Sequence, residues 1–121
     1  MTTAASSQTE WDAAKEEIRT LLIERAKVRG MIPYSELVGK VHNMHLEAHD
    51  QRLFHLLMEI SSAEDAAGRG MLSVIVVHKA GDMQPGPGFF ELAKNLGRDT
   101  SDILTCWVQE LKRVYSVWSP T

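Results

Sequence analysis

The feature that most constrains the fold is an apolar run with four β-branched residues in succession. The run spans residues 72–77 and contains Val74, Ile75, Val76 and Val77. Branching at Cβ restricts χ1 and favours strands, and an uninterrupted apolar run suits a strand that is buried on both faces. A single strand would leave its backbone donors and acceptors unpaired, so this one requires partner strands elsewhere in the chain.

Two other segments are candidate partners for this strand. Met31–Tyr34 is short and apolar, and its proline suits only the edge of a sheet or the start of a helix. Gly88–Phe90 follows a loop, Ala80–Gly88, in which glycines permit positive φ and prolines exclude helix. The sequence therefore predicts a small antiparallel sheet, with a stiff glycine-proline turn that docks or presents Phe89 and Phe90.

The other apolar residues recur every three to four positions, which predicts amphipathic helices. The first begins at Trp11, and Gly30 is expected to close it in the left-handed conformation. Ser35 and either Thr100 or Ser101 are expected to cap two of the later helices. The predicted helices are residues 11–30, 35–41, 50–60, 90–96 and 101–118.

Length and composition indicate one domain in a reducing compartment. The 121 residues are 44% hydrophobic, enough for a core, with residues 1–9 predicted as a disordered tail and residues 10–121 as a single domain. The lone Cys106 lies in a helical pattern, which favours a buried thiol. Because no 18-residue apolar stretch and no signal-like N-terminus occur, we expect a cytoplasmic protein without membrane contact.

The order of these elements over roughly residues 10 to 90 resembles that of winged helix-turn-helix domains. Met31–Tyr34 would be the first strand, Ser35–Val41 and Asp50–Ile60 the helical pair, and Ala80–Gly88 the wing. The resemblance implies an α+β, mostly helical, winged-helix-like fold with a small antiparallel sheet and an added C-terminal helix. The segment LSVIVVHKAGDMQPGPGFFELAKNLGR also resembles small uncharacterised proteins of bacteria and phages, which have no known activity to transfer.

A winged-helix fold would place the third helix in the major groove of double-stranded DNA. Gln51, Arg52 and His55 would then face the bases, and Arg69 and Lys79 would contact phosphates. The net charge is −3, so the positive surface would have to be local, and several acids nearby would oppose it: Glu47, Asp50, Glu59, Glu64 and Asp65. The sequence thus predicts a DNA-binding or regulatory protein, and a protein-interaction module without nucleic acid is the alternative.

The final helix carries more aromatic surface than a small winged-helix domain needs for its core. Trp107, Tyr115 and Trp118 lie on its apolar stripe. Such residues are common anchors of interfaces, which favours a homodimer, and they could equally close the domain's own core.

Motifs for metal binding and catalysis are incomplete. His42, His45, His49 and His55 could supply imidazole ligands, but no cysteine or acid stands in a recognised spacing with them, so exposed helix histidines are favoured. Pro85 and Pro87 remove the backbone donors that a phosphate cradle needs. We therefore expect no metal and no cofactor.

Candidate catalytic residues also lack their partners. Glu110-Leu111-Lys112 has the acid-x-lysine spacing of some nucleases, but it lies in a helical stripe and not on a strand. Neither Ser73 nor Cys106 has an identifiable activating base. The sequence predicts a non-enzymatic protein.

Overall fold

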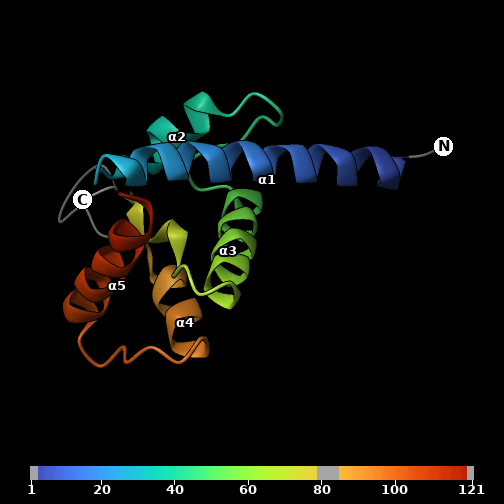
Figure 1. Cartoon of the computed structure of the whole chain (residues 1–121). Coiled ribbons are helices and arrows are strands. Elements are labelled where there is room, and N and C mark those ends of the chain that lie inside the picture. Colours follow the sequence, from blue (N-terminus) through green and yellow to red (C-terminus); the bar gives the residue numbers. More distant parts are fainter. Residues whose placement is uncertain (1–2, 79–84, 120–121) are drawn as a thin grey trace.

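The computed structural model describes residues 3–78 and 85–119, with side chains described from residue 8 onward. Figure 1 shows a mostly helical molecule in which a long first helix crosses the others and extends past them at its N-terminal end. In chain order the described elements are α1 (Thr3–Lys27), β1 (Ile32–Pro33), α2 (Tyr34–Lys40), α3 (Gln51–Ala66), a 3-10 turn η1 (Leu72–Ile75), β2 (Val76–Val77), α4 (Pro87–Asn95) and α5 (Ile103–Trp118).

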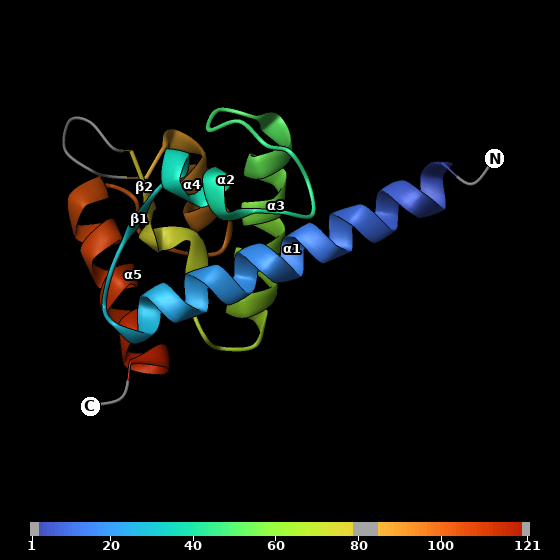
Figure 2. The ribbon, with the colours of Figure 1, turned by 90° about the horizontal axis from the view of Figure 1, so that it is seen from above.

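The two described strands are parallel, so the prediction of an antiparallel sheet is wrong. Ile32 pairs with Val76 and Pro33 with Val77. The chain leaves β1, passes through α2 and α3, and returns to β2 in the same direction (Figure 2). Such a crossover through helices is how two neighbouring parallel strands are joined.

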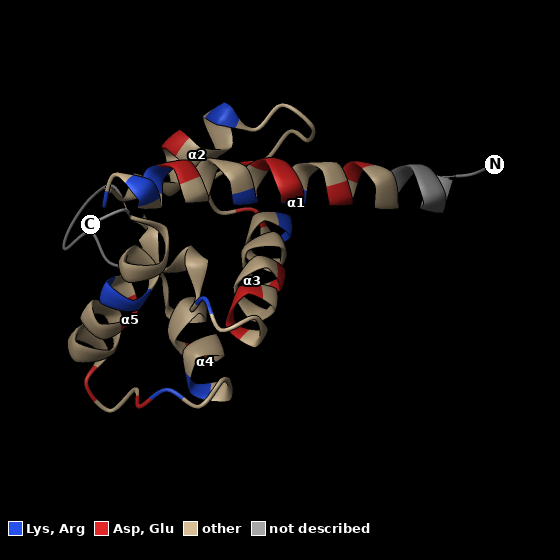
Figure 3. Cartoon of the chain, viewed as in Figure 1, with Lys and Arg blue, Asp and Glu red and all other residues tan. Residues whose placement is uncertain are grey.

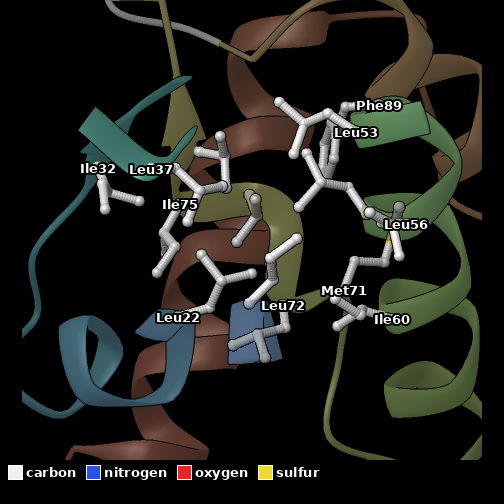
Figure 4. Packing of buried hydrophobic residues seen from close by; sticks show 14 of the residues in the cluster. Leu22, Ile32, Leu37, Leu53, Leu56, Ile60, Met71, Leu72, Ile75 and Phe89 are labelled. Carbon is white, nitrogen blue, oxygen red and sulfur yellow. The ribbon is translucent and has the colours of Figure 1, made fainter. Parts of the chain in front are cut away.

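Only the last two residues of the predicted strand 72–77 form a strand, because Leu72–Ile75 is a 3-10 turn. This turn contacts α1, α3 and α5 and lies at the centre of the core. Leu72, Val74 and Ile75 are fully buried there, beside Leu22, Leu56 and Met71 (Figure 4). The β-branched run therefore predicted burial correctly, but the predicted strand is present only at Val76 and Val77.

The strand predicted at Gly88–Phe90 is also wrong, because these residues form the first turns of α4. Pro87 occupies the start of that helix, where its missing N–H costs nothing and its fixed φ is already helical. Of the predicted wing, residues 80–84 lie outside the described part of the chain. Within the described residues, no strand follows β2 to complete the antiparallel hairpin of a wing.

The first helix differs from its prediction at both ends. It begins at Thr3, so residues 3–9, predicted as a disordered tail, belong to α1. The left-handed residue after the helix is Arg29, with φ of 55°, and not Gly30. A Cβ on Gly30 would lie 2.8 Å from Cδ of Arg25. The small residue thus leaves room for Arg25, whose guanidinium donates to the carbonyl oxygen of Met31 at 2.9 Å.

None of the helices in the described ranges is long and apolar enough to cross a lipid bilayer.

Candidate functional site

An apolar pocket of about 320 Å³ lies between α3, the loop that precedes it, and the start of α4. Its walls are apolar side chains of α3 and α4: Leu53, Phe54, Leu57, Met58, Phe89 and Leu92. Exposed residues line it as well, among them Ala48, His49, Gln51 and Pro87, so it opens to solvent. This volume is at the lower end of the range of about 300–1,000 Å³ that is usual for ligand sites.

The glycine-proline turn builds one side of this pocket. The backbone N–H of Gly86 donates to the hydroxyl oxygen of Tyr34 at 3.2 Å, which fixes the turn to the start of α2. Gly88 lies so close to Phe54 that a Cβ there would be 2.0 Å from Cε1 of the ring. Phe89 then packs into the core with only 7% of its surface exposed. The turn was predicted to dock Phe89 and Phe90 or to present one of them; Phe89 is buried in the core, and Phe90 packs against it partly exposed.

One hydroxyl of the pocket lining, that of Ser73, is buried. Ser73 belongs to η1 and has 8% of its surface exposed, while its neighbour Ser61 of α3 is fully buried. The Ser61 hydroxyl donates to Oγ of Ser73 at 2.6 Å, and the backbone N–H of Ser73 donates to Oγ of Ser61 at 2.9 Å. Sequence reasoning considered Ser73 only as a nucleophile, because no local signal indicates that a serine of α3 lies beside it.

The ionisable groups that line the pocket leave it close to neutral. Burial raises the pKa of Tyr34, so its phenol stays uncharged at neutral pH. Hydrogen bonds from Arg52 lower the pKa of Asp50, and the Arg52 guanidinium lies 2.7 Å from that carboxylate. Asp50 also caps α3 by accepting from the backbone N–H of Arg52. Among the residues that the structure describes, no lysine or arginine lines the pocket.

Of the residues predicted to contact DNA, the four that the structure describes do not form one positive surface. Gln51, Arg52 and His55 are exposed along the first half of α3, but the Arg52 guanidinium is bound to Asp50 and to the carbonyl oxygen of His45. Arg69 lies beyond the other end of α3, paired with Glu64 at 2.7 Å. Lys79 lies outside the described residues. Figure 3 shows lysines and arginines dispersed among acids along α1 and at α3 and α5.

The aromatic residues predicted as an interface pack against the chain's own core. The indole N–H of Trp107 donates to the carbonyl oxygen of Val74 at 3.2 Å, and the Tyr115 hydroxyl donates to that of Gly30 at 2.8 Å. The Trp118 ring has the guanidinium carbons of Arg19 and Arg69 at 5.9 and 6.0 Å. Of the two interpretations of this stripe, closure of the core is the one these contacts support, and the homodimer stays a prediction.

Within the described residues, no group of three or more histidine, cysteine or acidic side chains is placed to hold a metal. His45 pairs with Glu47 at 2.8 Å, and the backbone N–H of His42 donates to Glu17. Glu110, the acid of the nuclease-like spacing, is 1% exposed and accepts hydrogen bonds from Arg98 and from the Met71 N–H. Burial raises the pKa of the Cys106 thiol, which opposes formation of a thiolate.

The pocket between α3 and α4 is therefore an open cavity of the size of a small ligand site, and Glu110 is a buried acceptor within the fold. Comparison with models of protein families, with curated proteins and with solved structures found no match for this chain.

Proposed function

We propose that this protein is a protein-interaction module that receives an uncharged, apolar side chain of a partner protein in the pocket between α3 and α4. The observation that carries this proposal is the pocket itself. A concave apolar space with a few polar groups near its opening is the usual form of a binding site. In protein interfaces, a few anchor residues that fill such pockets supply most of the binding energy.

The charges of the pocket favour an uncharged anchor. Among the described lining residues the one carboxylate is that of Asp50, and it already accepts hydrogen bonds from the backbone and the guanidinium of Arg52. A cationic anchor would have to displace Arg52, and an anionic anchor would find no lysine or arginine in the described part of the lining. Burial of an unpaired charge is strongly unfavourable, so an apolar side chain is the occupant that fits.

The opening of the pocket suits a partner that continues beyond its anchor. His49 and Gln51 are exposed beside it, and Pro87 borders it from α4. A protein interface commonly surrounds a buried apolar centre with a hydrated polar rim. The polar side chains of this rim can hydrogen bond with the partner's backbone.

Selection of peptides displayed on phage against the wild-type protein tests the proposal, with Ala48→Trp as the blocking variant. Ala48 is exposed in the loop and lines the pocket, so an indole at this position would fill the opening. We expect selected peptides to share an apolar anchor and to lose at least tenfold in affinity toward Ala48→Trp, as measured by calorimetry. Thr105→Trp is the matched control, because Thr105 is exposed on α5 and does not line the pocket.

Recognition of double-stranded DNA by α3 is the second candidate. Gln51 and His55 lie four residues apart on one face of the helix, and both side chains are exposed. Asp50 caps the same helix, Glu47 lies in the loop before it, and Arg52 is paired, which opposes approach of a phosphate backbone. Fluorescence anisotropy of a labelled DNA duplex, measured across salt concentrations, distinguishes the two candidate functions.

We expect only weak duplex binding, equal in the wild type and Arg52→Gln. Salt-dependent affinity that is lost in Arg52→Gln and kept in Ala48→Trp would establish DNA binding and overturn the proposed function.

A further inference from the structure

We propose that a second copy of this chain packs along an exposed apolar strip on α5, with the two copies of the helix antiparallel. The α5 strip consists of Leu104, Val108 and Leu111. Leu104 and Val108 have 53% and 36% of their surfaces exposed, and Leu111 is half-buried. None of the three lines the pocket between α3 and α4, and α5 lies at the edge of the molecule in both Figure 1 and Figure 2. Contiguous exposed apolar residues favour an interaction site, whereas isolated ones are ordinary.

The shape of the α5 strip fits another helix. Its members are spaced by four and then three residues, so their side chains lie on one side of α5. The helix turns its buried side chains, among them Cys106 and Glu110, to one side of the strip, and the exposed polar Thr105 and Lys112 to the other. A narrow apolar seam between a core-facing side and a polar side is the surface that one helix offers to another.

The charges of α5 complement a second copy of the same helix in antiparallel orientation. Lys112 is exposed in the second half of α5 and forms no ion pair among the described residues. Asp99 and Asp102 lie at the other end, where they accept hydrogen bonds from backbone N–H groups but also form no ion pair in the described chain. An antiparallel copy brings Lys112 of each chain toward the acidic end of the other, whereas a parallel copy brings the two lysines together. These contacts form twice around one two-fold axis, which closes the assembly as a dimer.

The size of this contact predicts a dimer that dissociates on dilution. The helix has 16 residues, so it is about 24 Å long, and a contact along one such helix is smaller than the roughly 800 Å² per partner of a standard interface. Sedimentation equilibrium of the full chain from about 10 μM to about 1 mM therefore spans the range in which monomer and dimer exchange. We expect the average mass to rise with concentration from that of one chain toward that of two.

Val108→Lys tests whether the α5 strip forms the contact. Val108 is central in the strip, so in the dimer the new ammonium groups would lie close to each other and to Lys112 of the other copy, and we expect dimerisation to weaken about tenfold or more. Val117→Lys is the matched control, because Val117 is an exposed valine of α5 that lies outside the strip. This control should dimerise like the wild type. Circular dichroism checks that both variants keep the helical content of the wild type.

Paramagnetic broadening between copies measures the orientation of the two helices. Spin-labelled Ser116→Cys, at an exposed position near the end of α5, is mixed with isotope-labelled wild type, and the natural Cys106 is shielded from the label because it is 3% exposed. In an antiparallel dimer the label lies near the start of the other helix, so we expect the amides of residues 101–104 to broaden.

A wild type that stays monomeric at the highest concentration would overturn the dimer. Equal dimerisation in Val108→Lys and Val117→Lys would overturn the α5 contact, and broadening around residue 116 would overturn the antiparallel arrangement. Dimerisation that is lost in Ala48→Trp and kept in Val108→Lys would place the second copy in the pocket between α3 and α4. Selection of peptides tests the pocket separately, so failure of the dimer is distinguishable from failure of the proposed function.

Discussion

The two ends of α3 differ in whether their side chains have partners within the chain. The first half of the helix contributes Leu53, Phe54 and Leu57 to a pocket of about 320 Å³ that opens to solvent. The last turns place Glu64 and Asp65 in a cluster of ion pairs with arginines of other segments. The same helix therefore ends in paired charges and begins at an unfilled apolar space.

The ionic end connects α3 to three other parts of the chain. Glu64 pairs with Arg19 of α1 and with Arg69, at 3.0 and 2.7 Å. Asp65 accepts from Arg98, which also donates to Glu110 of α5 at 2.9 Å. Burying charges is costly unless each has partners, and here each of these carboxylates has them. This end fixes the helices relative to one another.

The largest expected effect comes from breaking the ionic end. Glu110→Ala removes an acceptor that is 1% exposed and leaves the Met71 N–H and part of Arg98 without partners. Loss of one member of a buried ion pair costs about 3–5 kcal/mol, so we expect the free energy of unfolding to fall by that amount. Urea denaturation measures it. Gln109→Ala, at an exposed neighbouring position, is the control, and equal effects of the two changes would show that the network adds nothing.

A smaller effect is expected from Gly88→Ala at the pocket end. The new Cβ would lie 2.0 Å from Cε1 of Phe54, so the ring must move, and its free direction is the pocket. Overpacking of this kind costs about 1–3 kcal/mol, and the displaced ring should also weaken binding of selected peptides. Gly39→Ala is the matched change, because Gly39 is an exposed position of α2 and no described atom beyond its own helix lies within 4 Å of its Cβ.

Gly39→Ala should stabilise the protein by roughly 0.5–1 kcal/mol, since alanine is the better helix former. If Gly88→Ala also stabilised the protein, the close contact between α4 and Phe54 would not be a constraint on this fold.

The sequence predicted what is buried better than how the buried chain is folded. The run 72–77 was expected at the centre and lies there, because apolar side chains are buried whatever their backbone conformation. Its 3-10 turn was not predicted, since contacts with helices distant in the sequence determine it. The segment after the glycine-proline turn shows the same limit. The prolines before Phe89 argue against a helix only as far as Pro87, because a proline ring is compatible with the first position of a helix, and α4 begins there.

The candidate site was less predictable than the core. Gln51 and His49 were named for other roles, and the pocket they border depends on α4 approaching α3, which no local pattern encodes. The pairing of Ser61 with Ser73 joins residues that are 12 positions apart across a turn. Arg52 and Asp50, in contrast, are two residues apart, so their neutralising pair follows from a helix cap that the sequence does show.

The smallest expected effect is on the pH dependence of stability at the ionic end of α3. Hydrogen bonds from Arg69 and then Arg19 hold the pKa of Glu64 below its ordinary value of 4.5, against the opposing effect of burial. Between these two values the unfolded chain binds a proton that the folded chain does not, so acid favours unfolding. The stability contributed by Glu64 is fully present above about pH 6 and is lost as the pH falls through the lowered pKa.

We therefore expect the thermal midpoint to fall less between pH 7 and pH 4 in Glu64→Gln than in the wild type, although Glu64→Gln starts lower at pH 7. Glu24→Gln is the control, because that carboxylate is 67% exposed and pairs only with Lys27 among the described residues, so its pH dependence should match the wild type. Differential scanning calorimetry at several pH values gives the three curves. Parallel curves for the wild type and Glu64→Gln would mean that the arginines around Glu64 fix geometry without contributing to acid sensitivity.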